Sequence, residues 1–287
     1  MGTNPAFLRT LLILGRVSNL PTVWSNCLAG WLLADGGEAW RLAVLLLASS
    51  CLYIGGMYLN DAFDAGFDRQ NRRARPIPSN HISEALVWRI GFGLIGVGLL
   101  ALLPLGIRVT ALGVLLSASI IIYDAVHKAV AFSPILMALC RFFLLLMAAA
   151  AGNAGLTGTA LWTAIALAGW IVGLSYVARR EAFLGPLAKW PLVALALPLV
   201  LAYLINDGPW RMAGLLFSLL LLAWAIYCLR FTFQQENRNL QRTVGGLLAG
   251  ICLVDLLSIS PLSPVVGLVF VALFLLSLFG QRFVPAT

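Results

Sequence analysis

Ten apolar stretches run through this chain, and each is long enough, or nearly long enough, to cross a lipid bilayer as a helix. They cover about residues 11–34, 42–60, 86–105, 109–123, 132–152, 159–178, 190–205, 211–229, 244–259 and 265–281. A transmembrane helix needs roughly 20 mostly apolar residues, so three of the stretches (109–123, 190–205 and 244–259) are short and fit tilted, broken or re-entrant segments as well. The runs are continuous rather than alternating, which is typical of helices and not of a membrane barrel.

The composition agrees with a chain that is embedded in a bilayer. Of its 287 residues 61% are hydrophobic and only 10% are charged, and the mean hydropathy is +0.95. Soluble domains carry about 25% charged residues, so the composition excludes a soluble enzyme, a disordered chain and a small secreted scaffold. We predict an all-α polytopic membrane protein in which residues 1–287 form a single integral-membrane domain.

Lysine and arginine are distributed unevenly between the two sides of the predicted bundle. With a cytoplasmic N-terminus and ten crossings, thirteen of the 19 lie in inner segments, and the outer segments hold only Arg41, Arg108 and Arg211. Because cytoplasmic loops of membrane proteins are enriched in these residues, the bias predicts this orientation. It also accounts for the net charge of +8, so no nucleic-acid partner is needed to explain the charge.

The most informative polar segment follows the second apolar stretch and reads YLNDAFDAGFDRQNRRARPIPSN, from Tyr58 to Asn80. Asn60, Asp64 and Asp68 are spaced i, i+4 and i+8, which places three oxygen-bearing side chains along one face of a helix. Acidic groups at the end of a transmembrane helix normally face a cavity, and stacked acids repel one another unless a cation lies between them. Mg²⁺ suits such a site, because it is held by one or two carboxylates together with water and phosphate.

Basic residues and a proline stop come directly after this stripe. The four arginines are Arg69, Arg72, Arg73 and Arg75. Arginine pairs bidentately with phosphate oxygens, and Pro76 and Pro78 end helical structure. The whole segment therefore predicts a pocket for a metal-bound polyphosphate at the inner membrane face. For the arginines alone, a solvated juxtamembrane loop is an equally good interpretation.

The segment resembles the first signature of the UbiA superfamily of intramembrane prenyltransferases, which reads Asn-x-x-x-Asp-x-x-x-Asp after the second span and continues into Arg-Pro-x-Pro. Asn60, Asp64 and Asp68 match the signature, residues 75–78 match the continuation, and the order of spans matches over most of the chain. The resemblance implies that these three residues bind Mg²⁺ and the diphosphate of an isoprenyl donor. It also implies a bundle of nine family helices, with 265–281 as an additional tenth.

A second match is Tyr123 with His127 and Lys128, which resembles the family's Tyr-x-x-x-basic-basic stretch after the fourth span. By this resemblance Lys128 contacts phosphate and Tyr123 shapes the donor site. For Tyr123 an interfacial anchor is an equally good interpretation, since tyrosine is common at membrane interfaces. His127 is expected to be a surface residue rather than a ligand.

The resemblance fails after the sixth span, where the family carries a second aspartate motif. The stretch here reads GLSYVARREAFLG, and Ala178 and Ala182 align with the two expected aspartates. Glu181 is the only carboxylate left, and two methyl groups cannot hold a second Mg²⁺. Arg179 or Arg180 is expected to neutralise the diphosphate instead, as a guanidinium can without a metal. This departure resembles the divergent UbiA-like proteins called EboC.

Several polar residues at membrane depth are expected to line the central cavity or to meet the acceptor. Arg16 and Asn19 resemble the family's first-span Arg-x-x-Asn pattern, and Glu181 is expected to join them. Arg141, in the fifth span, either faces the same cavity or pairs with an acid such as Asp124.

The resemblance implies Mg²⁺-dependent transfer of an isoprenyl or polyprenyl group from its diphosphate to a lipophilic or aromatic acceptor within the membrane. The expected catalytic residues are Asp64, Asp68, Lys128 and Tyr123, and the expected diphosphate-binding residues are Arg72, Arg75, Lys128, Arg179 and Arg180. The alternative is a membrane carrier or export component that binds a prenyl lipid or diphosphate without transfer, which the missing second motif favours. Charge bias and resemblance together imply a bacterial cytoplasmic membrane with the site facing the cytoplasm.

Overall fold

The computed structural model describes residues 5–179, 191–206, 208, 211–233, 239–259 and 264–286, and all regular structure within these ranges is helical. The first half comprises α1 (Pro5–Leu14), η1 (Val17–Asn19), α2 (Leu20–Leu32), α3 (Ala39–Phe63), α4 (Ala65–Asn71), α5 (Glu84–Leu102), η2 (Leu103–Leu105), α6 (Ile107–Val126) and α7 (Ser133–Ala151). The second half comprises α8 (Gly158–Arg179), α9 (Pro191–Leu195), α10 (Leu197–Ile205), α11 (Arg211–Phe233), α12 (Leu240–Ala249), α13 (Ile251–Ser258) and α14 (Pro264–Gly280). The predicted all-α class is confirmed.

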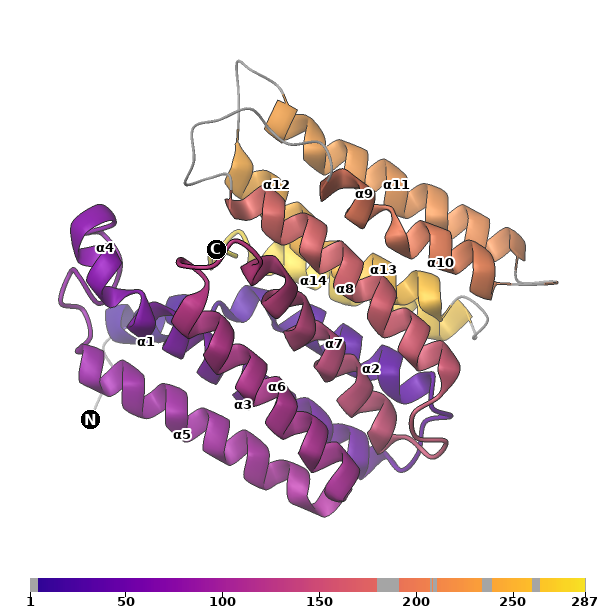
Figure 1. Ribbon diagram of the computed structural model, residues 1–287, viewed down its shortest axis with the longest axis horizontal. Helices are drawn as coiled ribbons and strands as arrows, with labels where there is room; N and C mark the ends of the chain where they lie inside the picture. Colours follow the sequence, from indigo (N-terminus) through magenta and orange to yellow (C-terminus); the bar gives the residue numbers. More distant parts are fainter. Residues whose placement is uncertain are drawn as a thin grey trace.

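The longer helices lie side by side in one bundle (Figure 1). α3, α5 and α6 form one flank, α9, α10 and α11 form the other, and α2, α7 and α8 lie between them. Close approaches of backbone hold the first half together. At Gly30, where α2 meets α7, and at Gly55, where α3 meets α5, an added Cβ would collide with the backbone of the neighbouring helix. Such contacts are typical of helix packing in lipid.

Seven helices among the described residues are long and apolar enough to cross a membrane. They are Ala39–Phe63, Glu84–Leu105, Ile107–Val126, Ser133–Ala151, Gly158–Arg179, Arg211–Phe233 and Leu240–Ser258. Two shorter apolar helices, Leu192–Leu204 and Val265–Gly280, fall on the predicted stretches 190–205 and 265–281. The stretch 109–123, which looked short in sequence, belongs to the full-length helix α6. The stretch 244–259 falls on the span Leu240–Ser258, which consists of α12 and α13 and is interrupted at Gly250.

The first apolar stretch is not one continuous helix. α1 ends at Leu14, and α2 begins at Leu20 after the turn η1. Between them Arg16 has φ 42° and ψ 47°, a left-handed conformation that residues other than glycine rarely adopt. The break directs the Arg16 side chain toward the polar end of α3, where it finds its partners.

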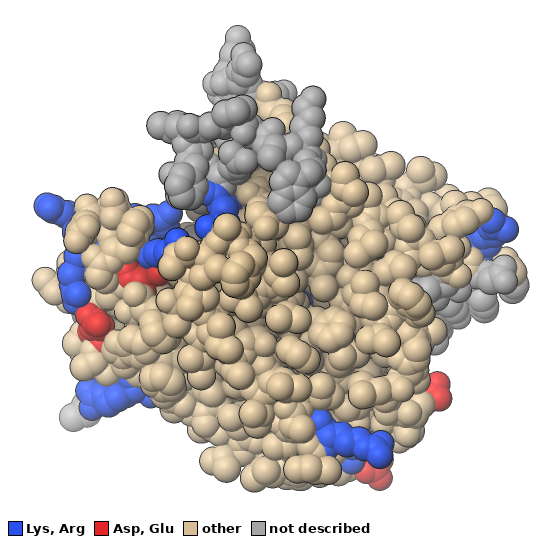
Figure 2. All heavy atoms as spheres, in the orientation of Figure 1, with Lys and Arg blue, Asp and Glu red and all other residues tan. Residues whose placement is uncertain are grey.

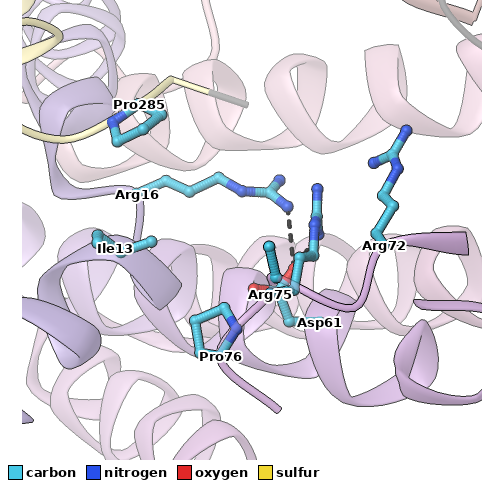
Figure 3. Close-up of a pocket in the computed structure, with 8 residues that line it drawn as sticks. Ile13, Arg16, Asp61, Arg72, Arg75, Pro76 and Pro285 are labelled. Atoms are coloured by element: carbon cyan, nitrogen blue, oxygen red, sulfur yellow. Dashed lines mark hydrogen bonds and ion pairs between the residues drawn. The ribbon is translucent and has the colours of Figure 1, made fainter. Parts of the chain in front are cut away.

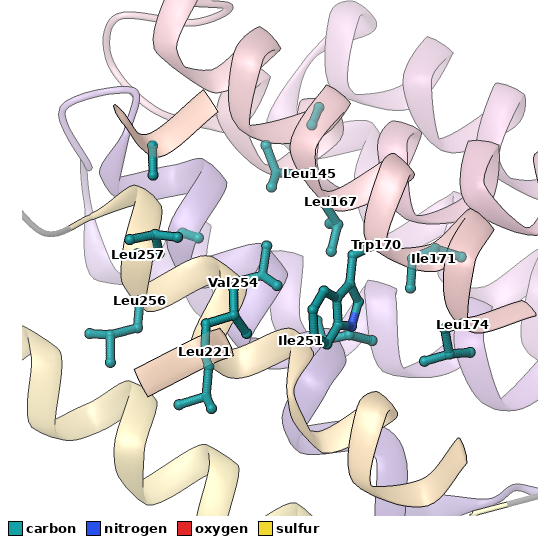
Figure 4. Close-up of a cluster of buried hydrophobic side chains, with 14 of the residues drawn as sticks. Leu145, Leu167, Trp170, Ile171, Leu174, Leu221, Ile251, Val254, Leu256 and Leu257 are labelled. Carbon is teal, nitrogen blue, oxygen red and sulfur yellow. The ribbon is translucent and has the colours of Figure 1, made fainter. Parts of the chain in front are cut away.

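The helices of the second half pack around Trp170 of α8 (Figure 4). Its indole is 1% exposed, and Nε1 donates a hydrogen bond to the carbonyl oxygen of Leu247 in α12 at 3.0 Å. Leu221 of α11 and Val254 of α13 belong to the same apolar cluster. Lipid is as apolar as these side chains, so close packing and satisfied polar groups hold the helices together.

On the face shown in Figure 2, charged side chains lie toward the two ends of the bundle, and the broad surface between them is uncharged. Basic and acidic side chains gather at the end that carries α4. Arg41, Arg108 and Arg211 lie in the first turns of α3, α6 and α11, at the opposite end. An apolar band between two charged ends is the pattern of a bundle that spans a bilayer, and the chain is an integral membrane protein.

Candidate functional site

A cavity of about 470 Å³ lies among α2, α3, α6, α7 and α8, at the end of the bundle that carries α4. Apolar side chains such as Leu116, Leu144 and Ile171 form much of its wall. Ten residues that the sequence singled out also line it: Arg16, Asn19, Asn60, Asp64, Arg72, Arg75, Tyr123, Lys128, Arg141 and Arg179. Residues from distant parts of the chain are therefore brought to one site.

The predicted stripe follows a nearly continuous helical path. Asn60 belongs to α3, Asp64 joins α3 to α4, and Asp68 lies in α4. The Asp64 amide donates to the carbonyl of Asn60 at 3.0 Å, and the Asp68 amide donates to that of Asp64 at 2.9 Å. All three side chains are buried, with relative exposures of 7%, 8% and 2%. Asn60 and Asp64 line the cavity, whereas Asp68, about one turn further on, does not.

Two basic side chains converge on Asp64. The Lys128 ammonium lies 2.6 Å from Asp64 Oδ1, and Nε2 of His127 lies 3.5 Å from the same oxygen. Burial alone would raise the pKa of the Asp64 carboxyl, but the hydrogen bonds and charges of His127 and Lys128 outweigh it and keep this pKa below its ordinary value. His127 lines the cavity and stacks on the Tyr123 ring at 5.0 Å. The expectation that it is a surface residue was wrong.

Asp61 is a site residue that the sequence did not reveal. Its Oδ1 accepts from Arg16 at 3.1 Å and from Arg75 at 2.8 Å, so two guanidinium groups from distant segments meet on one carboxylate (Figure 3). A second cavity of about 260 Å³ lies beside this cluster, lined by Arg72 among others. Arg75 also lies 3.6 Å from Asp68, yet burial raises the pKa of the Asp68 carboxyl, because the arginine charge only partly offsets it.

Asp124 is a second acid of the cavity, although the sequence analysis considered it only as a partner for Arg141. It is 4% exposed, lines the cavity, and accepts a hydrogen bond from Nδ2 of Asn60 at 2.9 Å through Oδ1. Its other oxygen has no hydrogen-bond partner among the residues that the structure describes. Asn60 is thereby held between Asp124 and Arg16, whose Nη2 donates to Asn60 Oδ1 at 3.2 Å.

The end of α8, where a second acidic motif was expected, contributes no carboxylate to the described wall of the cavity. Ser175, Ala178 and Arg179 line it there. Nη1 of Arg179 donates to the carbonyl of Ala131, in the loop between α6 and α7, at 2.5 Å. Arg180 and Glu181, to which the sequence analysis gave roles, lie outside the described residues.

Of the polar residues expected at membrane depth, Asn19 and Arg141 both have side-chain hydrogen-bond partners. Asn19 donates to the backbone carbonyl of Ala286 at 2.9 Å, so the segment after α14 returns to the cavity wall. Arg141 faces the cavity and donates to Asn26 at 2.8 Å and Thr22 at 3.0 Å. Among the described residues it forms no pair with Asp124, so that alternative was wrong.

The oxygen-bearing side chains fit a hard cation such as Mg²⁺. Asp68 Oδ1 is buried and has no hydrogen-bond partner within the described ranges. Asn60 and Asp64 line the cavity, where their Oδ1 atoms contact the cationic side chains of Arg16 and Lys128. No group of three or more His, Cys, Asp and Glu side chains in the described part of the chain forms a ready-made cage. Mg²⁺ does not require one, because water and substrate phosphate complete its coordination.

The family model of the UbiA prenyltransferase family matches residues 20–242. This is most of the chain, and the protein therefore belongs to the UbiA prenyltransferase family. The first-signature residues at 60, 64 and 68 and the Tyr123–Lys128 segment lie inside the matched range, whereas α13 and α14 lie beyond it.

Two curated relatives match shorter segments. Digeranylgeranylglyceryl phosphate synthase of Sulfolobus acidocaldarius is 31% identical over 103 residues, which are 34% of this chain and 36% of that protein. The Metallosphaera sedula protein of the same name is 35% identical over 82 residues, 29% of this chain and 28% of that protein. The chain thus matches about a third of the length of these relatives.

Two solved structures share the fold. A UbiA homologue from Aeropyrum pernix K1, solved in its apo form, has a TM-score of 0.64 at 17% identity and covers 84% of this chain and 96% of its own. A structure of digeranylgeranylglyceryl phosphate synthase in membranes has a TM-score of 0.61 at 18% identity, with 95% and 99% covered. The helical bundle described above is the UbiA fold.

Proposed function

We propose that this protein transfers an isoprenyl group from its diphosphate to an acceptor within the membrane. The observation that carries the proposal is the convergence of Asn60, Asp64, Lys128 and Arg179 on one cavity whose remaining wall is largely apolar. Such a cavity suits a substrate with a highly charged head and a hydrocarbon tail. Membership of the prenyltransferase family and the names of the matched relatives support the same reaction class.

In this proposal the diphosphate binds at the end of the cavity that carries α4. Asn60, Asp64 and Asp68 would hold Mg²⁺, which stabilises negative charge on the leaving pyrophosphate as a Lewis acid. Arg72 has no side-chain partner among the described residues and is free to bind phosphate. Lys128 forms an ion pair with Asp64 in this structure, and in the complex its ammonium would contact a phosphate oxygen instead. Positive charge that is already in place is most effective where negative charge develops.

The apolar wall protects the reacting carbon. When the allylic C–O bond breaks, its electron pair leaves with the pyrophosphate, and the cationic carbon must meet the acceptor before it meets water. Leu116, Leu144 and Ile171 exclude water from the interior of the cavity. Tyr123, at the edge of the charged cluster, would bound the space around the reacting carbon. The acceptor then bonds to that carbon and loses a proton to the departing pyrophosphate.

The charged end of the bundle is assigned to the cytoplasm, because most lysine and arginine residues belong to segments on that side. The assignment puts the diphosphate site at the inner face, in one membrane domain formed by the whole chain. A bacterial cytoplasmic membrane and a place in the EboC-like branch are parts of the proposal that follow from resemblance.

The test uses the full-length protein in lipid nanodiscs with Mg²⁺, radiolabelled geranyl or geranylgeranyl diphosphate and a panel of lipophilic and aromatic acceptors. We expect pyrophosphate release coupled to a labelled lipophilic product, and loss of both in Asp64→Asn. Arg69→Gln is the matched control, because Arg69 lies in α4 but pairs with Glu84 at 2.6 Å outside the cavity.

The competing function is a carrier on the same scaffold. The methyl group of Ala178 in the cavity wall, where the family has an acid, favours it. Binding of the labelled diphosphate with no turnover across the whole panel would overturn the transferase and leave the carrier.

A further inference from the structure

The carboxylate of Asp124 is a buried group at the cavity wall that the steps proposed above do not use. It lies in the last turn of α6, is 4% exposed, and lines the cavity beside Tyr123. Its Oδ1 accepts from Asn60 Nδ2 at 2.9 Å, whereas its Oδ2 is buried and has no hydrogen-bond partner among the described residues. Because buried polar atoms are normally paired, this oxygen indicates a partner that comes from outside the chain.

Asp124 also lacks a cationic partner of its own. Asp64, on the same cavity, is compensated by Lys128 at 2.6 Å. In the described ranges no lysine, arginine or histidine side chain lies within ion-pair distance of the Asp124 carboxylate. Arg16 is linked to it only through Asn60, whose amide group bonds to both. A buried carboxylate is costly unless an opposite charge compensates it, so a bound cation would stabilise Asp124.

The hydrogen bond from Asn60 fixes Asp124 beside the residues that are expected to bind the cation. Asn60 and Asp64 lie at the end of α3, Asp124 lies in α6, and all three line the same cavity. Each carries an oxygen of the amide or carboxylate type that Mg²⁺ prefers. At the end of α8 the described wall of the cavity has Ala178 where an acid was expected. Asp124 thus supplies from α6 a carboxylate that this wall lacks.

We propose that Asp124 is a ligand of the divalent cation held at the end of α3, with Oδ2 binding the ion while Oδ1 keeps its hydrogen bond to Asn60. The assignment rests on the proposed function and adds to it a residue outside the first-signature positions 60, 64 and 68. The cation would then be held from two helices, α3 and α6. One carboxylate of α6 would thereby take over part of the role that a second acidic motif on α8 would have.

The experiment measures Mn²⁺ binding to the full-length protein in nanodiscs by electron paramagnetic resonance, with geranylgeranyl thiolodiphosphate as an unreactive donor analogue. Mn²⁺ prefers the same oxygen ligands as Mg²⁺. Asp124→Asn removes the charge but keeps an oxygen that can accept from Asn60. We expect this variant to bind Mn²⁺ roughly tenfold or more weakly, since even the loss of a group that only supports a metal ligand costs about 10- to 100-fold in affinity.

Asp255 provides the matched control, because it is an equally buried acid that does not line the cavity. It lies in α13, is 0% exposed, and accepts from Asn26 Nδ2 at 2.8 Å. Asp255→Asn removes the same charge from the protein interior and should leave the Mn²⁺ affinity unchanged. A loss in Asp124→Asn alone would therefore belong to the cavity site and not to the removal of a buried charge in general.

Asp124→Cys tests the ligand role by a change of metal preference. A thiolate selects softer ions than a carboxylate does, so the ratio of Cd²⁺ to Mn²⁺ affinity should rise above that of wild type, which carries the same five native cysteines. If Asp124 only positions Asn60, Asp124→Asn folds with wild-type Mn²⁺ affinity, and that result would overturn the proposal. An unchanged ratio in Asp124→Cys would overturn it as well, and decides the matter if Asp124→Asn does not fold.

Donor binding separates this inference from the proposed function. With Mn²⁺, the thiolodiphosphate should bind wild type and fail to bind Asp64→Asn. If wild type does not bind it, the proposed function fails whatever Asp124 does. If wild type binds it and Asp64→Asn does not, while Asp124→Asn keeps wild-type Mn²⁺ affinity, only the assignment of Asp124 fails.

Discussion

The C-terminal ends of α3 and α8 flank the same cavity with opposite chemistry. The end of α3 presents Asp61 and Asp64, and Arg16, Arg75 and Lys128 compensate them within ion-pair distance. The end of α8 presents a serine, an alanine and an arginine whose guanidinium bonds only to a backbone carbonyl among its described partners. The α3 end therefore carries carboxylates that could bind a cation, whereas the α8 end carries a positively charged side chain of its own.

This difference suggests how one acidic motif can serve where two are usual. Acidic side chains can hold a cation that neutralises the charge of the diphosphate. A guanidinium neutralises that charge directly, without a metal. We therefore infer a division of roles, in which the α3 end binds the cation and the α8 end contributes charge to the diphosphate. The variants that follow test that division.

The largest effect is expected from the acids of the α3 end. Asp64→Ala and Asp68→Ala each remove an expected metal ligand, and each should lower kcat/KM by roughly a hundredfold or more, as when a preorganised electrostatic contact is lost. The Asp64 variant should lose more, because Asp64 lines the cavity and Asp68 does not. The measurement is labelled-product formation across a Mg²⁺ titration. Wild-type rates in both variants would remove the cation site from the α3 end.

A smaller effect is expected from Lys128→Gln. The ammonium would contact phosphate in the complex, so its loss should raise the KM for the donor by about tenfold to a hundredfold, the range for hydrogen bonds to charged groups. The Mg²⁺ requirement should persist. If Lys128→Gln instead changed the apparent Mg²⁺ affinity and left KM unaltered, the lysine would serve Asp64 and not the substrate.

Sequence alone carried much of this site, and its limits have physical causes. A helix that crosses a bilayer needs a long apolar stretch, so the helical class could be predicted from the sequence. Acidic residues are rare beside such stretches, so the Asn60–Asp68 stripe could also be recognised. The partners of Arg141 were not, because they lie 115 and 119 residues away on another helix. The role of Asp61 was not predicted for a similar reason. Its ion pair with Arg16 joins residues that are distant in sequence, and Arg16 lies at the left-handed turn that interrupts the first apolar stretch. His127 was misjudged, since its contact with Asp64 depends on how α6 packs against α3.

The α8 end should respond more weakly. Arg179→Gln should reduce kcat/KM by about tenfold or less, because one of several positive groups is removed and its guanidinium is also held by Ala131. Ala178→Asp provides the converse test, since it restores an acid to the cavity wall at the place where the family carries one. We expect the double variant Ala178→Asp with Arg179→Gln to depend more steeply on Mg²⁺ than Arg179→Gln alone. A loss for Arg179→Gln that exceeds that of Lys128→Gln would reverse the proposed division.

The smallest effect should come from a residue that serves only packing in the second half. Trp170→Phe keeps an aromatic ring in the cluster but removes the N–H that binds the Leu247 carbonyl, which leaves a buried acceptor unpaired and should cost about 1–3 kcal/mol of unfolding free energy. Trp170 does not line the cavity, so kcat/KM below the unfolding transition should stay near wild type. Thermal unfolding in detergent and initial rates measure the two quantities separately. A rate loss that matches Lys128→Gln at unchanged stability would mean that the packing of α8 against α12 sets the position of the Arg179 end, and the two ends would then be mechanically coupled and not independent.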